Sequence, residues 1–228
     1  MGLRYADSII TVSKTLKEHI ESVCQRTDVK YVPNGITLPE YVAAGDTLER
    51  YGLEPKKYIY SVGRYVPEKG LDDLINAYPK TGNHGYKLVV SGGADHKTNY
   101  SRLIKKLSGK TDGVVLTGYV SGKPMRELYS NAALFVLPSY YEGMPIALLE
   151  AMSYDLDVVV SDIPANKELD LPEECYFKTG DVDDLAEKLR MRLADKQKRD
   201  FKKILVEKYD WGKIAEQTKG IYRKLMPF

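Results

Sequence analysis

A buried strand, a polar loop and an apolar helix follow one another in the segment Leu134-Phe135-Val136-Leu137-Pro138-Ser139-Tyr140-Tyr141-Glu142-Gly143-Met144-Pro145-Ile146-Ala147-Leu148-Leu149-Glu150-Ala151-Met152. A short, continuous apolar run is typical of a parallel strand that is buried on both faces. Proline is favoured in the first turn of a helix, so the second apolar run predicts a helix that begins near Pro145. The segment therefore predicts one strand–loop–helix unit of an α/β sheet.

The chain on either side of this segment repeats the alternation of strand and helix. Apolar and β-branched runs predict strands at Tyr58–Val62, Lys87–Ser91, Val114–Thr117, Leu134–Pro138 and Val158–Ser161. Amphipathic stretches between them predict helices at Leu71–Tyr78, Asn99–Leu107, Lys123–Ser130 and Ile146–Ser153. This order is typical of an α/β fold with a doubly wound, Rossmann-like parallel sheet, in which ligands bind beyond the carboxyl ends of the strands.

The amino end of the chain adds one more unit of the same kind. Two short strands are predicted at Ser8–Val12 and Val29–Pro33. Ser13 can cap a helix that runs between them to about Cys24, because its hydroxyl can accept a hydrogen bond from a free amide of the first turn. A β-α-β unit is therefore expected before the main sheet.

Three helices are predicted near the carboxyl end. Asp181 or Asp183 can cap the first, and the others are Phe201–Tyr209 and Trp211–Leu225. A cluster of five basic side chains lies in this region: Lys196, Lys198, Arg199, Lys202 and Lys203. Because acidic residues interrupt the cluster, the pattern favours a solvated helix face over a membrane-binding patch.

The composition is that of an ordinary globular protein. Of the 228 residues, 43% are hydrophobic and 29% are charged, and the formal net charge is +2. Nucleic acid is not an expected partner, since it requires a concentrated basic surface. No apolar run approaches the roughly 20 residues that cross a bilayer, and the start of the chain resembles no secretory signal, which favours a cytoplasmic location. The two cysteines, Cys24 and Cys175, have no metal-site spacing and are expected to be core thiols.

Two cations flank the loop that follows the first strand of the main sheet, Val62-Gly63-Arg64-Tyr65-Val66-Pro67-Glu68-Lys69-Gly70. A glycine at the strand end lets a ligand approach the backbone, and the start of the next helix favours phosphate. Arg64 and Lys69 therefore predict a diphosphate site. Taken alone, the loop fits two surface charges beside a glycine-rich turn equally well.

The loop before Pro145 offers a second set of polar groups. If the helix begins there, the backbone amides from Gly143 to Ile146 are free to bind an anion. Glu142 lies on the loop, whereas Glu150 interrupts an apolar stretch of the helix, where a buried carboxylate needs polar partners. Ligand binding and hydrogen bonding to backbone donors explain Glu150 equally well.

Five landmarks occur in the order found in one enzyme family, and on them the chain resembles the C-terminal domain of the retaining GT-B glycosyltransferases of family 4, or group 1, over nearly its whole length. The landmarks are Ala6-Asp7-Ser8-Ile9-Ile10-Thr11-Val12-Ser13, Val32-Pro33-Asn34-Gly35-Ile36, Val62-Gly63-Arg64 with Pro67-Glu68-Lys69-Gly70, Gly118-Tyr119-Val120, and Pro138-Ser139 with Glu142-Gly143-Met144-Pro145 and Glu150-Ala151. The spaced glutamates in their glycine-proline context are a specific signal.

The resemblance implies transfer of a sugar from a UDP- or GDP-sugar donor to a glycan or a lipid-linked acceptor, as in polysaccharide biosynthesis, with retention of configuration. Arg64 and Lys69 are implied to hold the diphosphate and, with Glu142, to be catalytic. Glu150 is implied to bind the ribose, and the backbone at Tyr119 and Val120 to face the base. The implied donor-binding residues are Gly63, Tyr119, Val120, Gly143, Met144, Pro145, Ile146 and Glu150. No cofactor or metal is implied.

The resemblance also implies a domain organisation. Residues 1–35 correspond to the last β-α-β segment of an N-terminal acceptor domain, residues 36–208 to the nucleotide-sugar-binding domain, and residues 209–228 to a helix that crosses back to the acceptor domain. The rest of an acceptor domain is expected outside this chain, either in a longer protein or on a partner chain. We therefore expect this chain to bind a donor but to be inactive in transfer, and any membrane contact to come from the missing half.

Other functions fit the same architecture. A nucleotide-sugar epimerase would need further acid–base residues, and a glycogen-phosphorylase-like enzyme would need a cofactor lysine that the sequence does not place. A nucleotide-sugar-binding module without transfer activity is a third alternative, which assays of binding and of turnover would separate from a transferase.

Overall fold

Six parallel strands form the main sheet of the computed structural model, which describes residues 3, 5–82, 85–195 and 199–225. Their order in the sheet is β5-β4-β3-β6-β7-β8. The strands are β3 (Tyr58–Val62), β4 (Lys87–Ser91), β5 (Val114–Gly118), β6 (Leu134–Leu137), β7 (Asp157–Ser161) and β8 (Tyr176–Phe177). The direction of chain progression reverses between β3 and β6, so a crevice is expected at the carboxyl ends of these two strands.

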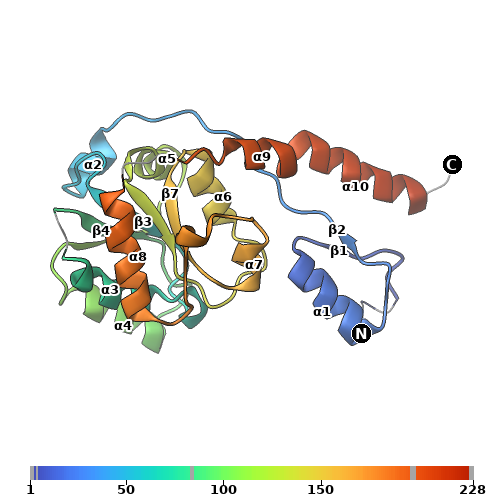
Figure 1. Cartoon of the computed structure of the whole chain (residues 1–228), viewed down its shortest axis with the longest axis horizontal. Helices are drawn as coiled ribbons and strands as arrows, with labels where there is room; N and C mark the ends of the chain where they lie inside the picture. The colour runs from blue at the N-terminus through green and yellow to red at the C-terminus, as the bar shows by residue number, and fades with distance from the viewer. Residues whose placement is uncertain (1–2, 4, 83–84, 196–198, 226–228) are drawn as a thin grey trace.

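Helices cover both faces of this sheet (Figure 1). One face packs against α2 (Asp46–Arg50), α5 (Gly122–Asn131), α6 (Ile146–Ser153) and α9 (Lys202–Lys208), and the other against α3 (Leu71–Ala77), α4 (Asn99–Ser108) and α8 (Val182–Ala194). Because side chains alternate along a strand, Tyr58 and Tyr60 of β3 enter the first core, whereas Ile59 enters the second. Short helical turns η2 (Pro67–Lys69), η3 (Tyr78–Thr81), α7 (Pro164–Lys167) and η4 (Glu173–Cys175) complete the connections.

A second, two-stranded parallel sheet lies beside the main body (Figure 1). It consists of β1 (Ile10–Thr11) and β2 (Lys30–Tyr31), joined by α1 (Lys14–Cys24), and α10 (Trp211–Leu225) extends along the same side of the molecule. The Glu168 carboxylate, just after α7, accepts hydrogen bonds at 2.8 Å from the amides of Lys14 and Thr15. An acid from the main body thus caps the first turn of α1.

The predicted elements are confirmed, most of them to within one residue. The bounds of β3, β4 and α6 match the prediction, and Ser13 caps α1. The two terminal strands are shorter than predicted, because only two residues of each pair in the small sheet. Asp181, rather than Asp183, caps α8, since its side chain accepts from the amides of Asp183 and Asp184.

The basic cluster differs from the prediction. Lys196 and Lys198 lie outside the described residues. The Arg199 side chain is only 12% exposed and forms an ion pair with Glu174 at 2.7 Å, so the solvated helix face is wrong for this residue. Cys175 is buried as predicted, but Cys24, at the end of α1, is only partly buried and is not a core thiol.

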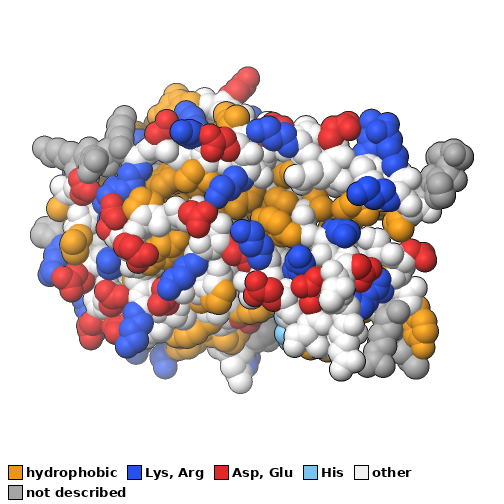
Figure 2. All heavy atoms as spheres, turned by 45° about the vertical axis from the view of Figure 1, so that its right-hand side comes forward, with side chains coloured by type: hydrophobic (Ala, Val, Ile, Leu, Met, Phe, Trp, Pro, Cys, Tyr) orange, Lys and Arg blue, Asp and Glu red, His pale blue; other side chains and the backbone are white. Residues whose placement is uncertain are grey.

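None of the helices in the described parts of the chain is long and apolar enough to cross a membrane. Basic and acidic side chains are interspersed over the face of the molecule that Figure 2 shows.

Candidate donor-binding site

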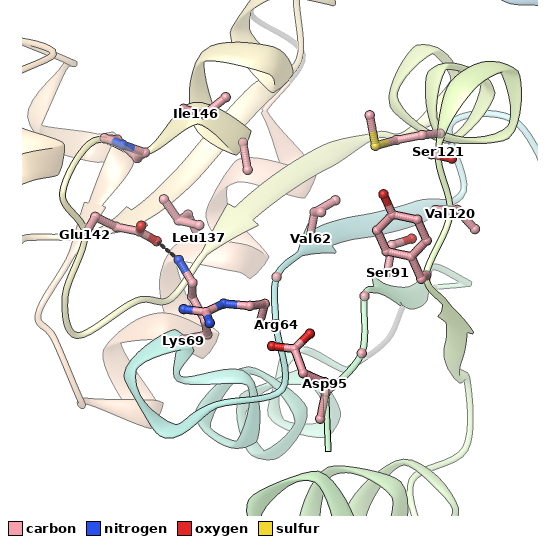
Figure 3. Close-up of a pocket in the computed structure, with 18 of the residues that line it drawn as sticks. Val62, Arg64, Lys69, Ser91, Asp95, Val120, Ser121, Leu137, Glu142 and Ile146 are labelled. Atoms are coloured by element: carbon pink, nitrogen blue, oxygen red, sulfur yellow. Dashed lines mark hydrogen bonds and ion pairs between the residues drawn. The ribbon is translucent and has the colours of Figure 1, made fainter. Parts of the chain in front are cut away.

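A cavity of about 650 Å³ opens at the carboxyl edge of the main sheet (Figure 3). Val62, Ser91 and Leu137, at the ends of β3, β4 and β6, form part of its wall. The loops that follow β3, β4, β5 and β6 supply most of the remainder, with Met125 of α5 and the first residues of α6. This is the place where a doubly wound sheet is expected to bind its ligand.

Two glycines bring these loops into direct backbone contact. Gly70 has a φ of +58°, and a Cβ there would lie 2.2 Å from the carbonyl oxygen of Pro138, at the end of β6. Gly92 has a φ of +132°, and a Cβ there would lie 2.0 Å from the carbonyl oxygen of Gly63. Any other residue would clash at these positions and strain the backbone, so both glycines are needed to close the cavity wall.

The loop after β3 presents the two predicted cations to the cavity. Arg64 is 64% exposed, and its nearest acid, Glu68, is 4.0 Å away. Lys69 ends the η2 turn, and its Nζ donates a hydrogen bond to Oε1 of Glu142 at 2.7 Å. The structure thus brings three predicted site residues, Arg64, Lys69 and Glu142, together on one wall (Figure 3).

Glu142 is held from a second direction. The hydroxyl of Ser139 donates to the same Oε1 atom at 2.6 Å, while Oε2 has no hydrogen-bond partner among the described residues. The loop is also tied to the η2 turn, because the amide of Tyr140 donates to the carbonyl of Glu68 at 2.9 Å. One carboxylate oxygen is therefore fixed and the other remains available to a ligand.

The start of α6 contributes backbone donors, although not all of the predicted ones. Pro145 is the residue before the helix, which begins at Ile146. Within the described chain, the amides of Gly143, Met144 and Ala147 have no hydrogen-bond partner. The amide of Ile146 donates to the carbonyl of Met144 at 2.9 Å, so the prediction that it is free is wrong. The tight turn at Pro145 is what brings these two groups together.

Of this loop, Met144, Pro145, Ile146 and Ala147 line the cavity, whereas Gly143 does not. Gly143 instead lies beside Val12 and Tyr31, where the small sheet meets the main body. Ile146 is 46% exposed, although it begins an apolar helix. An exposed apolar side chain at the rim suits contact with a flat or apolar part of a ligand.

Glu150 does not line this cavity. It is partly buried on α6, and its Oε2 accepts a hydrogen bond at 3.0 Å from the hydroxyl of Tyr129, whose ring stacks on Tyr154 at 5.3 Å between centroids. Burial raises the pKa of Glu150, and the hydrogen bond from Tyr129 partly offsets that rise. The polar partner that Glu150 requires is therefore a buried phenol, and not the backbone donor considered from the sequence.

The loop after β5 forms the far wall of the cavity. Tyr119 and Val120 line it, and the Tyr119 side chain is 84% exposed. Gly118 has a φ of +72°, which turns the chain out of the strand with open space around it. The two predicted donor-binding residues are therefore placed together, opposite the charged wall.

Two residues near the cavity were not predicted. Asp95 lines it near Arg64 (Figure 3), and Ser139 is fully buried beneath Glu142. The double glycine that precedes Asp95 was a usable signal, because glycines at a strand end often mark close approach of a ligand. No local pattern indicates that the Ser139 hydroxyl reaches Glu142. In the described residues, no group of three or more histidine, cysteine, aspartate or glutamate side chains could hold a metal ion.

Comparison with known proteins identifies relatives among the glycosyltransferases. Residues 47–215 match the family described as glycosyl transferases group 1. An uncharacterized glycosyltransferase of Methanocaldococcus jannaschii is 33% identical over 96% of this chain and 60% of its own length. The α-D-kanosaminyltransferase of Streptomyces kanamyceticus is 29% identical over 78% of this chain and 48% of its own. The chain thus spans roughly half to three fifths of these two relatives.

Solved structures have the same fold. Sucrose-phosphate synthase from Thermosynechococcus elongatus superposes with a TM-score of 0.83 at 24% identity, over 98% of this chain and 59% of that one. HepE of Anabaena, solved in complex with UDP and glucose, superposes with a TM-score of 0.85 at 17% identity, over 98% of this chain and 65% of that one. With the family match over most of its length, the chain belongs to the group 1 glycosyl transferases, and its fold is that of their GT-B structures.

Proposed function

We propose that the chain is the donor-binding half of a retaining glycosyltransferase, which transfers a sugar from a nucleotide-diphosphate sugar to a glycan or a lipid-linked acceptor. The observation that carries the proposal is the wall formed by Arg64, Lys69 and Glu142, together with the free amides at the start of α6 that line the cavity. Cations and helix-start amides are the groups that bind a diphosphate. The Glu142 carboxylate, which lies beside Lys69, can accept hydrogen bonds from the hydroxyls of a sugar.

The positive charges of Arg64 and Lys69 determine their proposed role in the reaction. When the bond between the sugar and the diphosphate breaks, negative charge grows on the leaving nucleoside diphosphate. Arg64 and Lys69 stabilise that charge, which lowers the barrier. We propose that these cations and the start of α6 hold the diphosphate without a metal ion, and that no cofactor takes part.

The base and the ribose of the donor have separate assignments. The base lies against Tyr119 and Val120, across the cavity from Arg64. The ribose is assigned to Glu150 from the family resemblance and not from position, because Glu150 does not line the cavity. Its Oε1 has no hydrogen-bond partner in the described chain, while Tyr129 holds Oε2. UDP- and GDP-sugars are the donors we favour, and HepE of Anabaena has also been solved in complex with UDP-glucose.

The acceptor site belongs, on this proposal, to a second domain. The chain therefore binds a donor but transfers no sugar by itself at a useful rate, because correct positioning and exclusion of water need both domains.

The test has two parts. The first is a thermal-shift screen of UDP-, GDP- and ADP-sugars, in which at least one donor should raise the melting temperature of the chain, and the Arg64→Ala variant should lose that rise. Incubation with the labelled donor and candidate acceptors should then give no transfer. Absence of any shift would remove the donor-site assignment, and robust transfer would show that an acceptor site lies within these residues.

A further inference from the structure

Ser139 lies two residues after the end of β6, and its fully buried side chain contacts Glu142 of the cavity wall. It donates to Oε1 of Glu142 at 2.6 Å, and Lys69 donates to the same atom at 2.7 Å. Figure 3 shows the Lys69–Glu142 pair at the cavity wall. Two donors on one oxygen leave Oε2, which has no hydrogen-bond partner in the described chain, as the acceptor for a ligand.

The position of Ser139 is itself fixed from behind. Its carbonyl accepts a hydrogen bond at 2.5 Å from the hydroxyl of Ser161, at the end of β7. The side-chain amide of Asn166, in α7, donates to the carbonyl of Ser161 at 2.9 Å and to its hydroxyl at 3.1 Å. All three residues are 0% exposed. A buried chain of hydrogen bonds thus anchors the hydroxyl that reaches Glu142.

The two donors to Glu142 differ in mobility. Lys69 is a long side chain, 20% exposed, and stands beside the cavity, where a diphosphate would attract its ammonium group. If Lys69 turns towards a diphosphate, Glu142 loses its cation. Ser139 has no solvent to turn to, so its hydrogen bond remains.

We propose that Ser139 is a positioning residue for the donor sugar. On the function proposed above, Ser139 holds Oε1 of Glu142 when the diphosphate takes Lys69, and keeps Oε2 directed at a hydroxyl of the transferred sugar. Ser139 therefore acts on the sugar through Glu142 and does not touch the donor itself. Recognition of the diphosphate does not depend on it.

The experiment is calorimetry with four ligands, UDP, UDP-glucose, GDP and GDP-mannose, on wild type and S139A. For the nucleotide that wild type binds, S139A should change the affinity for the free diphosphate less than about twofold. It should lower the affinity for the nucleotide sugar by about tenfold, the loss expected for one hydrogen bond to a charged group. Ser61→Ala is the matched control, because Ser61 is also 0% exposed but its hydroxyl has no partner in the described chain.

The outcomes separate the two proposals. Failure of wild type to bind any of the four ligands refutes the assignment of a UDP- or GDP-sugar donor, and the role of Ser139 with it. If wild type binds, but S139A weakens both ligands of a pair equally or weakens neither, the role of Ser139 alone is refuted. Should S139A not fold, Ser139→Cys replaces it, since a thiol has a similar size but is a weak donor, and the same affinity ratio decides.

Discussion

Both edges of the main sheet collect charged side chains, but they differ in how completely those charges are paired. At the amino edge, the Arg192 side chain is 4% exposed and pairs with Asp157, at the start of β7, and with Asp195 at 2.8 Å. Arg199 joins the same group through Asp157 and Asp195, each at 3.5 Å, and also pairs with Glu174. At the carboxyl edge, Arg64 is 64% exposed, and the acid with which it pairs, Glu68, is 4.0 Å away.

This difference separates a structural cluster from a binding site. Carboxylates compensate the charge of both guanidinium groups, although Arg192 Nε and Arg199 Nη1 have no hydrogen-bond partner in the described chain. Removal of either partner leaves a buried charge. Cations that face a cavity beside free amides have unused donors. A basic residue thus predicts an anion site only when nearby carboxylates leave its charge uncompensated.

The largest expected effect is at the amino edge. Arg192→Leu removes the hydrogen-bonded partner of the partly buried Asp157 and leaves it only Arg199, at 3.5 Å. The free energy of unfolding, measured by urea denaturation, should fall by about 3 kcal/mol, the lower end of the range for a broken buried pair. Arg190→Leu, on the exposed face of the same helix, is the control and should stay within about 0.5 kcal/mol of wild type. Equal losses in the two variants would show that the cluster is not structural.

At the carboxyl edge the loss should appear in binding and not in stability. Arg64→Ala should weaken UDP or GDP by about 1.5–3 kcal/mol, while uridine or guanosine binding barely changes. Arg102→Ala, exposed on α4, serves as the control. Calorimetry of both ligand types decides, because equal losses for nucleoside and diphosphate would place Arg64 away from the phosphates.

A buried acid that accepts hydrogen bonds from backbone amides should make the stability of the fold depend on pH. Burial acts to raise the pKa of Glu127, but hydrogen bonds from Thr47 and from the amides of Leu48 and Gly45 outweigh it and lower the pKa. The charged form therefore stabilises the fold above the ordinary glutamate pKa, and this contribution is lost as the pH falls through the lowered value.

Glu127→Gln should therefore cost about 1 kcal/mol at neutral pH, as expected for loss of a helix cap. Denaturation of both proteins from pH 7 to pH 3 should show the gap closing on acidification. A gap that does not depend on pH would mean that the charge of Glu127 has no part in capping α2.

Glu150 should give the smallest change in stability, with the opposite dependence on pH. Because burial raises its pKa, wild type loses stability as the pH rises from the ordinary glutamate pKa to the raised value, and Glu150→Gln does not. The free energy of unfolding of the variant should stay within about 1 kcal/mol of that of wild type. Relative to wild type, the variant should become more stable as the pH rises.

If Glu150 holds the ribose, Glu150→Gln should also weaken ribonucleotides and leave deoxyribonucleotides nearly unchanged. Calorimetry of both sugar types tests this. A lowered melting temperature with unchanged ribose discrimination would leave Glu150 as a partner of Tyr129 alone.

The sequence predicted the fold and the cavity loops because their signals are local. Apolar runs marked β3, β4 and α6, and glycine beside two cations marked the loop after β3. The features that were missed depend on partners far apart in the chain. Arg199 looked solvated because its partner Glu174 belongs to another element, and nothing in the order of residues indicates that Tyr129 meets Glu150. The local sequence pattern does not show which distant residues come into contact in the folded chain.

The most direct test of the account is calorimetric titration of UDP and GDP into the wild-type chain in the presence of EDTA. The cations at the carboxyl edge should hold a diphosphate by themselves, so at least one of these nucleotides should bind without a divalent ion, and far more tightly than its nucleoside. No binding of either nucleotide, or binding only after a divalent metal is added back, would contradict the account.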